Sequence, residues 1–212
     1  MAYTSACMET LAKLFGGQAR IKIMRLFLLN PDQLFEIEEV ISRSRVMKPG
    51  ARRELSHLLA MGFIKSKFIT KEGARGAKKK VPGWMLNQNF SYLSQIKDLL
   101  VDPNLLLQED IIHRFRPIGK IKFLVVSGVF IGAEQSRVDV MIVGDKLKKN
   151  VLQQVLKSLE AEIGKELNYV LFDSAEFIYR LSMYDKLVCD ILDFPHQKLI
   201  DNPQLSTYIS KK

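Results

Sequence analysis

Apolar residues recur at helical spacing through much of the first hundred positions, and the runs stop at glycine, proline or asparagine. The clearest run begins at Pro49 and ends before Gly62, and both residues suit a helix boundary. Its apolar residues gather on one face: Ala51, Leu55, Leu58 and Leu59. The same pattern predicts further helices at residues 8–14, 20–29, 36–42 and 89–101, with a very short strand at 34–35.

Two strand-like runs, residues 63–70 and 81–86, flank the segment EGARGAKKK. Because this segment holds two glycines and four basic residues, it predicts the solvated loop of a hairpin. The predicted elements then follow the order helix, short strand, helix, turn, helix and hairpin. That order is typical of a winged helix-turn-helix, whose third helix reads the major groove of DNA.

The second half changes to short runs of valine and isoleucine, which are typical of strands buried on both faces. Strands are predicted at 121–126, 138–143, 168–172 and 196–200, with an amphipathic helix at 147–163 and helical stretches over 175–192. We therefore expect an α+β chain with a winged helix-turn-helix in residues 1–87, a connecting helix and linker in 88–104, and a small α/β domain in 105–212.

The positive charge of the chain is confined to its first half. The net charge is +9; residues 1–100 hold 17 Lys and Arg against 8 Asp and Glu, whereas residues 101–212 hold 15 of each. A chain that is basic only for solubility does not need this asymmetry, but a module that docks on phosphates does. The asymmetry therefore favours nucleic-acid binding by the first half.

The predicted third helix carries polar residues opposite its apolar face. Arg53, Ser56 and His57 lie on the outward side, with Arg52 on the flank. Arginine can make paired hydrogen bonds to guanine in the major groove, while flanking cations hold phosphates. The basic residues near this helix and in the hairpin complete the candidate DNA-binding set: Lys48, Arg52, Arg53, Ser56, His57, Lys65, Lys67, Lys71, Arg75, Lys78, Lys79 and Lys80.

Two other interpretations of these cations stay open. Each cation could be a solvated surface residue of a small structural bundle. A basic hairpin also suits duplex RNA, although the paired aromatic residues of RNA-binding sheets are not evident.

Composition disfavours several classes of protein. Cys7 and Cys189 fit neither a metal-binding spacing nor a disulfide framework. The longest nearly apolar stretch, residues 123–133, is too short to span a bilayer, and the N-terminus lacks the pattern of a signal peptide. We expect a cytoplasmic protein with no membrane association, no metal and no cofactor.

Four segments carry a resemblance to a known family: LFGGQARIKIMRLFLLNP, PGARREL with the MGFI that follows it, KKKVPGWMLN, and FLVVSGVFIGAEQSRVDVMIVGD. With them the chain resembles winged-helix transcriptional regulators fused to a nucleotidyltransferase-like domain of the DNA polymerase beta superfamily. The resemblance implies that residues 105–212 form the nucleotidyltransferase-like domain.

Active members of that superfamily carry a Gly-Ser turn and then a strand bearing Asp-x-Asp, whose carboxylates hold two Mg²⁺. In this chain the turn is Ser127-Gly128, in the reverse order. Arg137 stands at the first Asp position, and Asp139 matches the second. Asn168 stands where the resemblance implies a third acid.

The resemblance thus implies the fold and argues against nucleotide transfer, so we expect no enzyme activity. One carboxylate and a guanidinium cannot hold a metal pair, because the arginine brings positive charge to the place of the cations. We expect Arg137 to pair with Asp139 or a neighbouring acid, or to contact a phosphate of a bound nucleotide. Glu166 and Asp173 are expected to face away from Asp139.

Three hypotheses about function follow. The leading one is a sequence-specific regulator of transcription that binds double-stranded DNA and uses an inactive second domain for dimerisation or ligand sensing. A homodimer and a nucleotide ligand are further partners that it allows. The second hypothesis is an active or antitoxin-type nucleotidyltransferase with a DNA-binding arm. The third is an architectural or partner-binding protein that uses the hairpin for something other than DNA.

Overall fold

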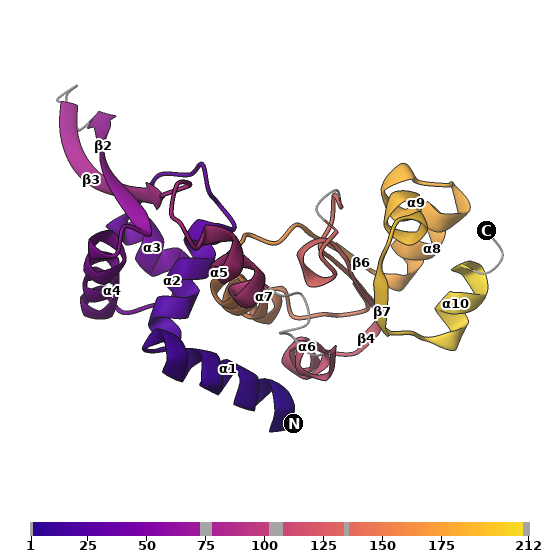
Figure 1. Cartoon of the computed structure of the whole chain (residues 1–212). Helices are drawn as coiled ribbons and strands as arrows, with labels where there is room; N and C mark the ends of the chain where they lie inside the picture. The colour runs from indigo at the N-terminus through magenta and orange to yellow at the C-terminus, as the bar shows by residue number, and fades with distance from the viewer. Residues whose placement is uncertain (1, 73–77, 102–107, 134–135, 210–212) are drawn as a thin grey trace. The chain divides into compact units, whose positions relative to one another are not determined.

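The computed structural model describes residues 2–72, 78–101, 108–133 and 136–209, with the backbone alone at 2–8, 71–72, 78–79 and 206 (Figure 1). Within this part, ten α-helices, two short 3₁₀ helices and seven strands in two small sheets confirm the expected α+β class. The chain divides into two compact units. The first holds Met1–Asp102 and Lys157–Glu166, and the second holds Pro103–Leu156 and Leu167–Lys212.

The first unit combines a helical bundle with a three-stranded antiparallel sheet of order β1-β3-β2. Its elements are α1 (Ala2–Phe15), α2 (Gln18–Leu28), β1 (Phe35–Glu36), α3 (Ile37–Ser44), α4 (Lys48–Ala60), β2 (Ile64–Glu72), β3 (Lys78–Leu86), α5 (Leu93–Leu100) and the end of α7 (Lys149–Ile163). Phe27 and Phe35 meet edge to face in its core, with ring centroids 5.6 Å apart. The predicted helices and strands of the first half are thus confirmed, with shifted ends.

The end of α7 is held against α2 by hydrogen bonds from the side chains of Arg25 and Asn30. The Arg25 guanidinium donates through Nε to the carbonyl of Leu100 at 2.7 Å and through Nη1 to the carbonyl of Glu162 at 2.9 Å. The Nδ2 of Asn30 donates to the carbonyl of Gly164 at 2.8 Å. Gly164 has φ +94°, and a Cβ there would lie 2.5 Å from the Arg25 carbonyl carbon, so the close approach requires glycine.

The second unit is built on a four-stranded sheet of order β6-β5-β4-β7, in which only β5 and β6 run parallel. Its elements are α6 (Gln108–Phe115), β4 (Ile121–Val126), β5 (Val140–Gly144), the start of α7, β6 (Tyr169–Phe172), α8 (Ser174–Ser182), α9 (Lys186–Asp193), β7 (Gln197–Ile200) and α10 (Pro203–Ile209), with 3₁₀ turns at Arg116–Ile118 and Gly128–Phe130. One core cluster joins alternate residues of β4 and β5 to α8, α9 and α10, so these helices cover one face of the sheet.

The predicted strands of the second half are confirmed, and its helices differ from the prediction in two places. Helices α6 and α10, of eight and seven residues, were not predicted. The helical stretches predicted over 175–192 are confirmed as α8 and α9. Tyr184, at φ 52°, follows α8, and Asp185 caps α9 by accepting hydrogen bonds from the backbone N–H groups of Leu187 and Val188. None of the helices in the described ranges combines the length and apolar character needed to cross a membrane.

Candidate functional site

Helix α4 has one buried and one exposed face. Ala51, Leu55 and Leu58 pack inward as predicted, but Leu59 is 40% exposed, so its predicted place on the packing face is wrong. Glu54, only 2% exposed, is buried instead. At about 100° per residue, Glu54 and Leu59 flank the buried arc at equal angles, so helical periodicity alone does not choose between them.

Glu54 is buried because charged partners surround its carboxylate. Its Oε2 accepts from Arg20 Nε of α2 at 2.7 Å, and its Oε1 accepts from Arg53 Nε at 3.2 Å. Burial acts to raise the pKa of Glu54, but the hydrogen bonds and charges of Arg20 and Arg53 outweigh it and hold the pKa below its usual value. The carboxylate is therefore ionised beneath the exposed face of α4.

The outward face of α4 carries the predicted polar residues, and some of them have partners. Arg52, Arg53, Ser56 and His57 are exposed. Arg20 Nη2 lies 2.8 Å from His57 Nδ1, and since a guanidinium can only donate, Nδ1 accepts and the ring proton is on Nε2. Lys48, at the start of the helix, pairs with the exposed Glu38 at 2.6 Å.

The hairpin is longer than predicted. Strands β2 and β3 form nine opposed pairs, from Ile64 opposite Leu86 to Glu72 opposite Lys78. The predicted loop over residues 72–80 is therefore wrong in extent, and Lys71 and Lys78 to Lys80 belong to strands. The ladder continues because every residue except proline has a backbone N–H that can pair across an antiparallel hairpin.

The basic side chains of the hairpin do not all share a face. Lys65, Lys67 and Lys80 are exposed. Lys65 and Lys67 lie on one face and Lys80, opposite Thr70, on the other, because successive strand residues alternate. Lys71, Lys78 and Lys79 are described by their backbone alone, and Arg75 lies outside the described residues.

Phe68 on β2 is an exposed aromatic residue that sequence reasoning missed. It is 74% exposed and lies opposite Pro82, on the same face as Lys80. The third strand covers only the base of the hairpin, where Phe35 pairs with Trp84, and Figure 1 shows the hairpin projecting beyond α3 and α4. The signal in the sequence that could have identified Phe68 is its place between two lysines of β2, Lys67 and Lys71.

Three of the four predicted transferase-like residues, Ser127, Gly128 and Asp139, are brought together, but in structural roles. Ser127 is buried and its Oγ donates to the carbonyl of Pro195 at 2.7 Å. Asp139 is buried, and its Oδ1 accepts from the N–H of Val129 at 3.0 Å while Oδ2 accepts from the N–H of Asn168 at 2.9 Å. Gly128 has φ +56°, and a Cβ there would overlap Asp139 Oδ1, so the turn requires glycine. Asp139 thus holds two backbone segments together.

The other charged residues of this region lie apart from Asp139. Arg137 pairs with Asp190 of α9 at 3.5 Å rather than with Asp139. Glu166 pairs with Arg43 at 3.6 Å, and Asp173 caps α8. Among the residues that the structure describes, no group of three or more His, Cys, Asp and Glu side chains is arranged to hold a metal ion.

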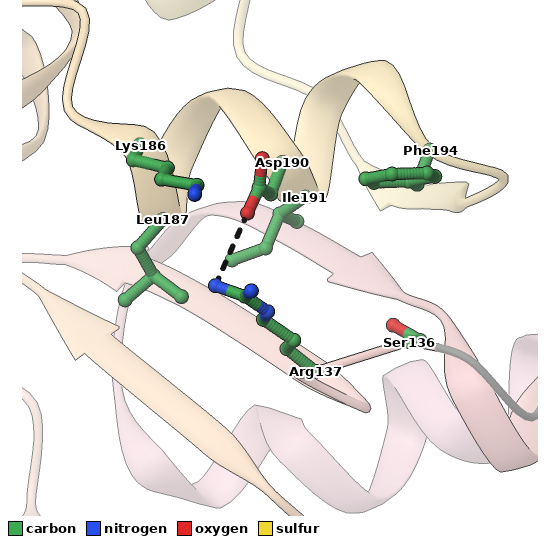
Figure 2. Close-up of a pocket in the computed structure, with 7 residues that line it drawn as sticks. All are labelled: Ser136, Arg137, Lys186, Leu187, Asp190, Ile191 and Phe194. Carbon is green, nitrogen blue, oxygen red and sulfur yellow. Dashed lines mark ion pairs between the residues drawn. The ribbon is translucent and has the colours of Figure 1, made fainter.

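A hollow of about 370 Å³ lies beside the Arg137–Asp190 ion pair in the second unit (Figure 2). It is lined by Ser136, Arg137, Lys186, Leu187, Asp190, Ile191 and Phe194. Figure 2 shows Arg137 reaching toward Asp190 across the hollow, with Lys186 and Phe194 at opposite ends of α9. The hollow thus combines two cations, one acid and an apolar wall.

Comparison of the chain with protein families, with curated proteins and with solved structures finds no match.

Proposed function

We propose that this chain binds double-stranded DNA through its first unit and acts as a sequence-specific regulator of transcription. Elements α2, β1, α3, α4, β2 and β3 follow one another in the order of a winged helix-turn-helix, with the sheet order β1-β3-β2. In this assignment α4 is the recognition helix and the β2–β3 hairpin is the wing.

The observation that carries the proposal is the burial of the single acid of α4. Glu54 points inward, so Arg52, Arg53, Ser56 and His57 are exposed with no carboxylate of their own helix among them. A polyanion that approaches this face meets cations and neutral hydrogen-bond donors. The major groove of DNA accepts a helix of this kind, and its guanines accept paired hydrogen bonds from arginine.

The candidate residues take different parts in this proposal. Arg53 reads a base, and the Nε2–H of His57 donates to a base edge or a phosphate. Lys65, Lys67 and Lys80 contact phosphates along the wing. The remaining hairpin cations, Lys71, Arg75, Lys78 and Lys79, add to the same electrostatic attraction.

The second unit serves dimerisation or ligand sensing in this proposal, and it does not transfer nucleotides. Both carboxylate oxygens of Asp139 already accept backbone N–H groups, and the residue two positions earlier is an arginine. Purified protein, Mg²⁺, labelled nucleoside triphosphates and candidate protein or RNA acceptors should give no label transfer above background. Metal-dependent transfer would overturn this part and support the nucleotidyltransferase hypothesis.

The experiment that tests DNA binding is selection of bound duplexes from a random pool with the full chain, followed by fluorescence anisotropy on the enriched sequence. We expect one enriched motif, and its symmetry would report whether two copies bind together. Affinity should fall roughly tenfold or more between about 50 and 200 mM salt, because bound phosphates release counterions. No enrichment, or equal binding to duplex RNA of any sequence, would overturn the proposal.

Variants separate base reading from phosphate contact. Arg53→Ala should lose about 1–3 kcal/mol on the selected site and little on random duplex, and Arg53→Lys should not restore the loss, because lysine cannot make the paired contact. Combined replacement of Lys65, Lys67 and Lys80 by glutamine should weaken all duplexes alike and flatten the salt dependence. Lys149→Gln in the second unit is the control.

A further inference from the structure

The hollow beside α9 has a polar end and an apolar wall. Leu187 and Ile191 lie one helical turn apart on α9 and form part of the wall, and Phe194 directly after the helix extends it. Phe194 is 61% exposed although it is a large aromatic residue. A volume of about 370 Å³ suits a small organic molecule, since ligand pockets begin at about 300 Å³.

The charges of the hollow do not balance. Arg137 and Lys186 supply two positive charges, and Asp190 supplies one negative charge. Among the described residues Lys186 has no ion-pair partner. The Arg137–Asp190 pair is long, at 3.5 Å, and Arg137 is 67% exposed, so the pair contributes little to stability and can open at small cost.

We propose that this hollow binds a small organic anion, a carboxylate or phosphate attached to a planar ring. The charged group lies between Arg137 and Lys186 and takes the place of Asp190 on the guanidinium. The ring lies against Leu187, Ile191 and Phe194, where it removes apolar surface from water. The proposal supplies a ligand class for the sensing role of the second unit, and it rests on residues of that unit alone.

This arrangement predicts that replacing Arg137 and replacing Asp190 change the affinity for the ligand in opposite directions. Arg137→Gln and Lys186→Gln remove attraction and should each weaken binding, by about fivefold for a partly exposed pair. Asp190→Asn removes the group that competes with the ligand for Arg137, so it should strengthen binding by a similar factor. Phe194→Ala should weaken ligands that have a ring and leave inorganic phosphate unaffected.

The test is calorimetric titration of the full-length protein with benzoate, phenyl phosphate and adenosine 5′-monophosphate. Benzamide, acetate and inorganic phosphate serve as matched probes that lack either the charge or the ring. Binding of benzoate alone would identify a carboxylate site, and binding of only the two ring phosphates a phosphate site; either supports the proposal. Lys149→Gln and Tyr179→Ala, a cation and an exposed aromatic elsewhere in the second unit, are the controls and should change nothing.

Two results would overturn the inference. One is the absence of heat or of shifted backbone amide signals at millimolar probe with every compound. The other is binding that is unchanged in Lys186→Gln and Phe194→Ala, or that weakens in Asp190→Asn. DNA binding is measured separately by anisotropy. A negative ligand titration therefore leaves the proposed function of the first unit unaffected, and a negative DNA-binding result leaves the proposed ligand site unaffected.

Discussion

Glu54 lies beneath three side chains that border the outward face of α4: Arg20, Arg53 and His57. A buried carboxylate without partners is strongly disfavoured, and here two guanidinium groups supply the hydrogen bonds that replace water. Because Arg20 belongs to α2, the same contact joins the two helices. The buried Glu54 therefore positions Arg53 and His57, two of the side chains proposed to contact DNA.

Replacing this carboxylate by an amide should destabilise the first unit. Glu54→Gln keeps the shape but leaves Arg20 without its charged partner, and we expect a loss of about 1.5–3 kcal/mol in the free energy of unfolding. Urea unfolding at neutral pH measures it. Glu38→Gln removes an exposed acid that pairs with Lys48 and should change stability by less than about 0.5 kcal/mol. Equal losses in the two variants would contradict the role given to burial.

The native chain and Glu54→Gln together also test the lowered pKa of Glu54. Because the folded-state pKa lies below the usual value of 4.5, the stabilisation is fully present above that value and is lost as pH falls through the folded pKa. The difference in stability between the native chain and Glu54→Gln should therefore shrink from pH 7 to about pH 3. A difference that stays constant over this interval would show that the carboxylate is not held ionised.

At the scale of elements, the β2–β3 hairpin extends beyond the strand that supports its base, and Phe68 is left uncovered there. In the proposed wing, its ring would contact sugars or base edges in a minor groove, as apolar side chains do in DNA-bending proteins. The contact would add apolar burial to the attraction between lysines and phosphates.

Phe68→Ala should weaken duplex binding by about fivefold or more, equivalent to about 1 kcal/mol of lost apolar contact. The thermal unfolding midpoint should not move, because the ring packs against little in the free protein. Leu14→Ala on α1, where the side chain is 70% exposed, is the control. Unchanged DNA affinity together with a changed oligomeric state would assign Phe68 to a protein contact instead.

The end of α7 is a second element whose position depends on one residue. Gly164 combines a left-handed backbone with contact to the Arg25 backbone, whereas Gly62, at φ +75°, has no atom within 4 Å of the position of a Cβ. Gly62→Ala should cost only the backbone strain, about 1 kcal/mol, while Gly164→Ala adds a steric clash and should cost about 2–4 kcal/mol. Urea unfolding of both variants checks the difference, and equal costs would contradict the close packing.

For the whole molecule, the first unit is not continuous in sequence. It includes residues 157–166, which come after β4 and β5 in the sequence. Carbonyl groups of this segment accept hydrogen bonds from Arg25 and Asn30. A chain cut after residue 102 would lack the carbonyls of Glu162 and Gly164, so Arg25 Nη1 and Asn30 Nδ2 would lose hydrogen bonds that they make in the full chain.

A fragment of residues 1–102 should therefore unfold at a lower temperature than the first unit does in the full chain. A synthetic peptide of residues 149–166 added in trans should raise its melting temperature in a concentration-dependent way, as a ligand of the folded state does. The same peptide carrying Gly164→Ala is the control and should raise it less. Circular dichroism follows both, and no response to either peptide would contradict the shared packing.

Much of the fold followed from local pattern. The strands of the second half and the helices α2 to α5 lie where periodicity and helix boundaries placed them, because each has a continuous apolar face and a residue that stops it. The exposed residues of α4 followed from the same argument. Helices α6 and α10 were missed, although α6 is as long as α3 and α5.

The sequence by itself determined the α+β class, the confinement of positive charge to the first half, and the outward position of Arg52, Arg53, Ser56 and His57. Tertiary structure decided what lies beneath them. Periodicity places Glu54 and Leu59 at equal angles from the buried arc, and the guanidinium of Arg20, 34 positions away, determines that the carboxylate turns inward. It likewise paired Arg137 with Asp190 and assigned Asp139 to backbone N–H groups. Such choices depend on the partners that folding brings together, and local sequence carries no record of them.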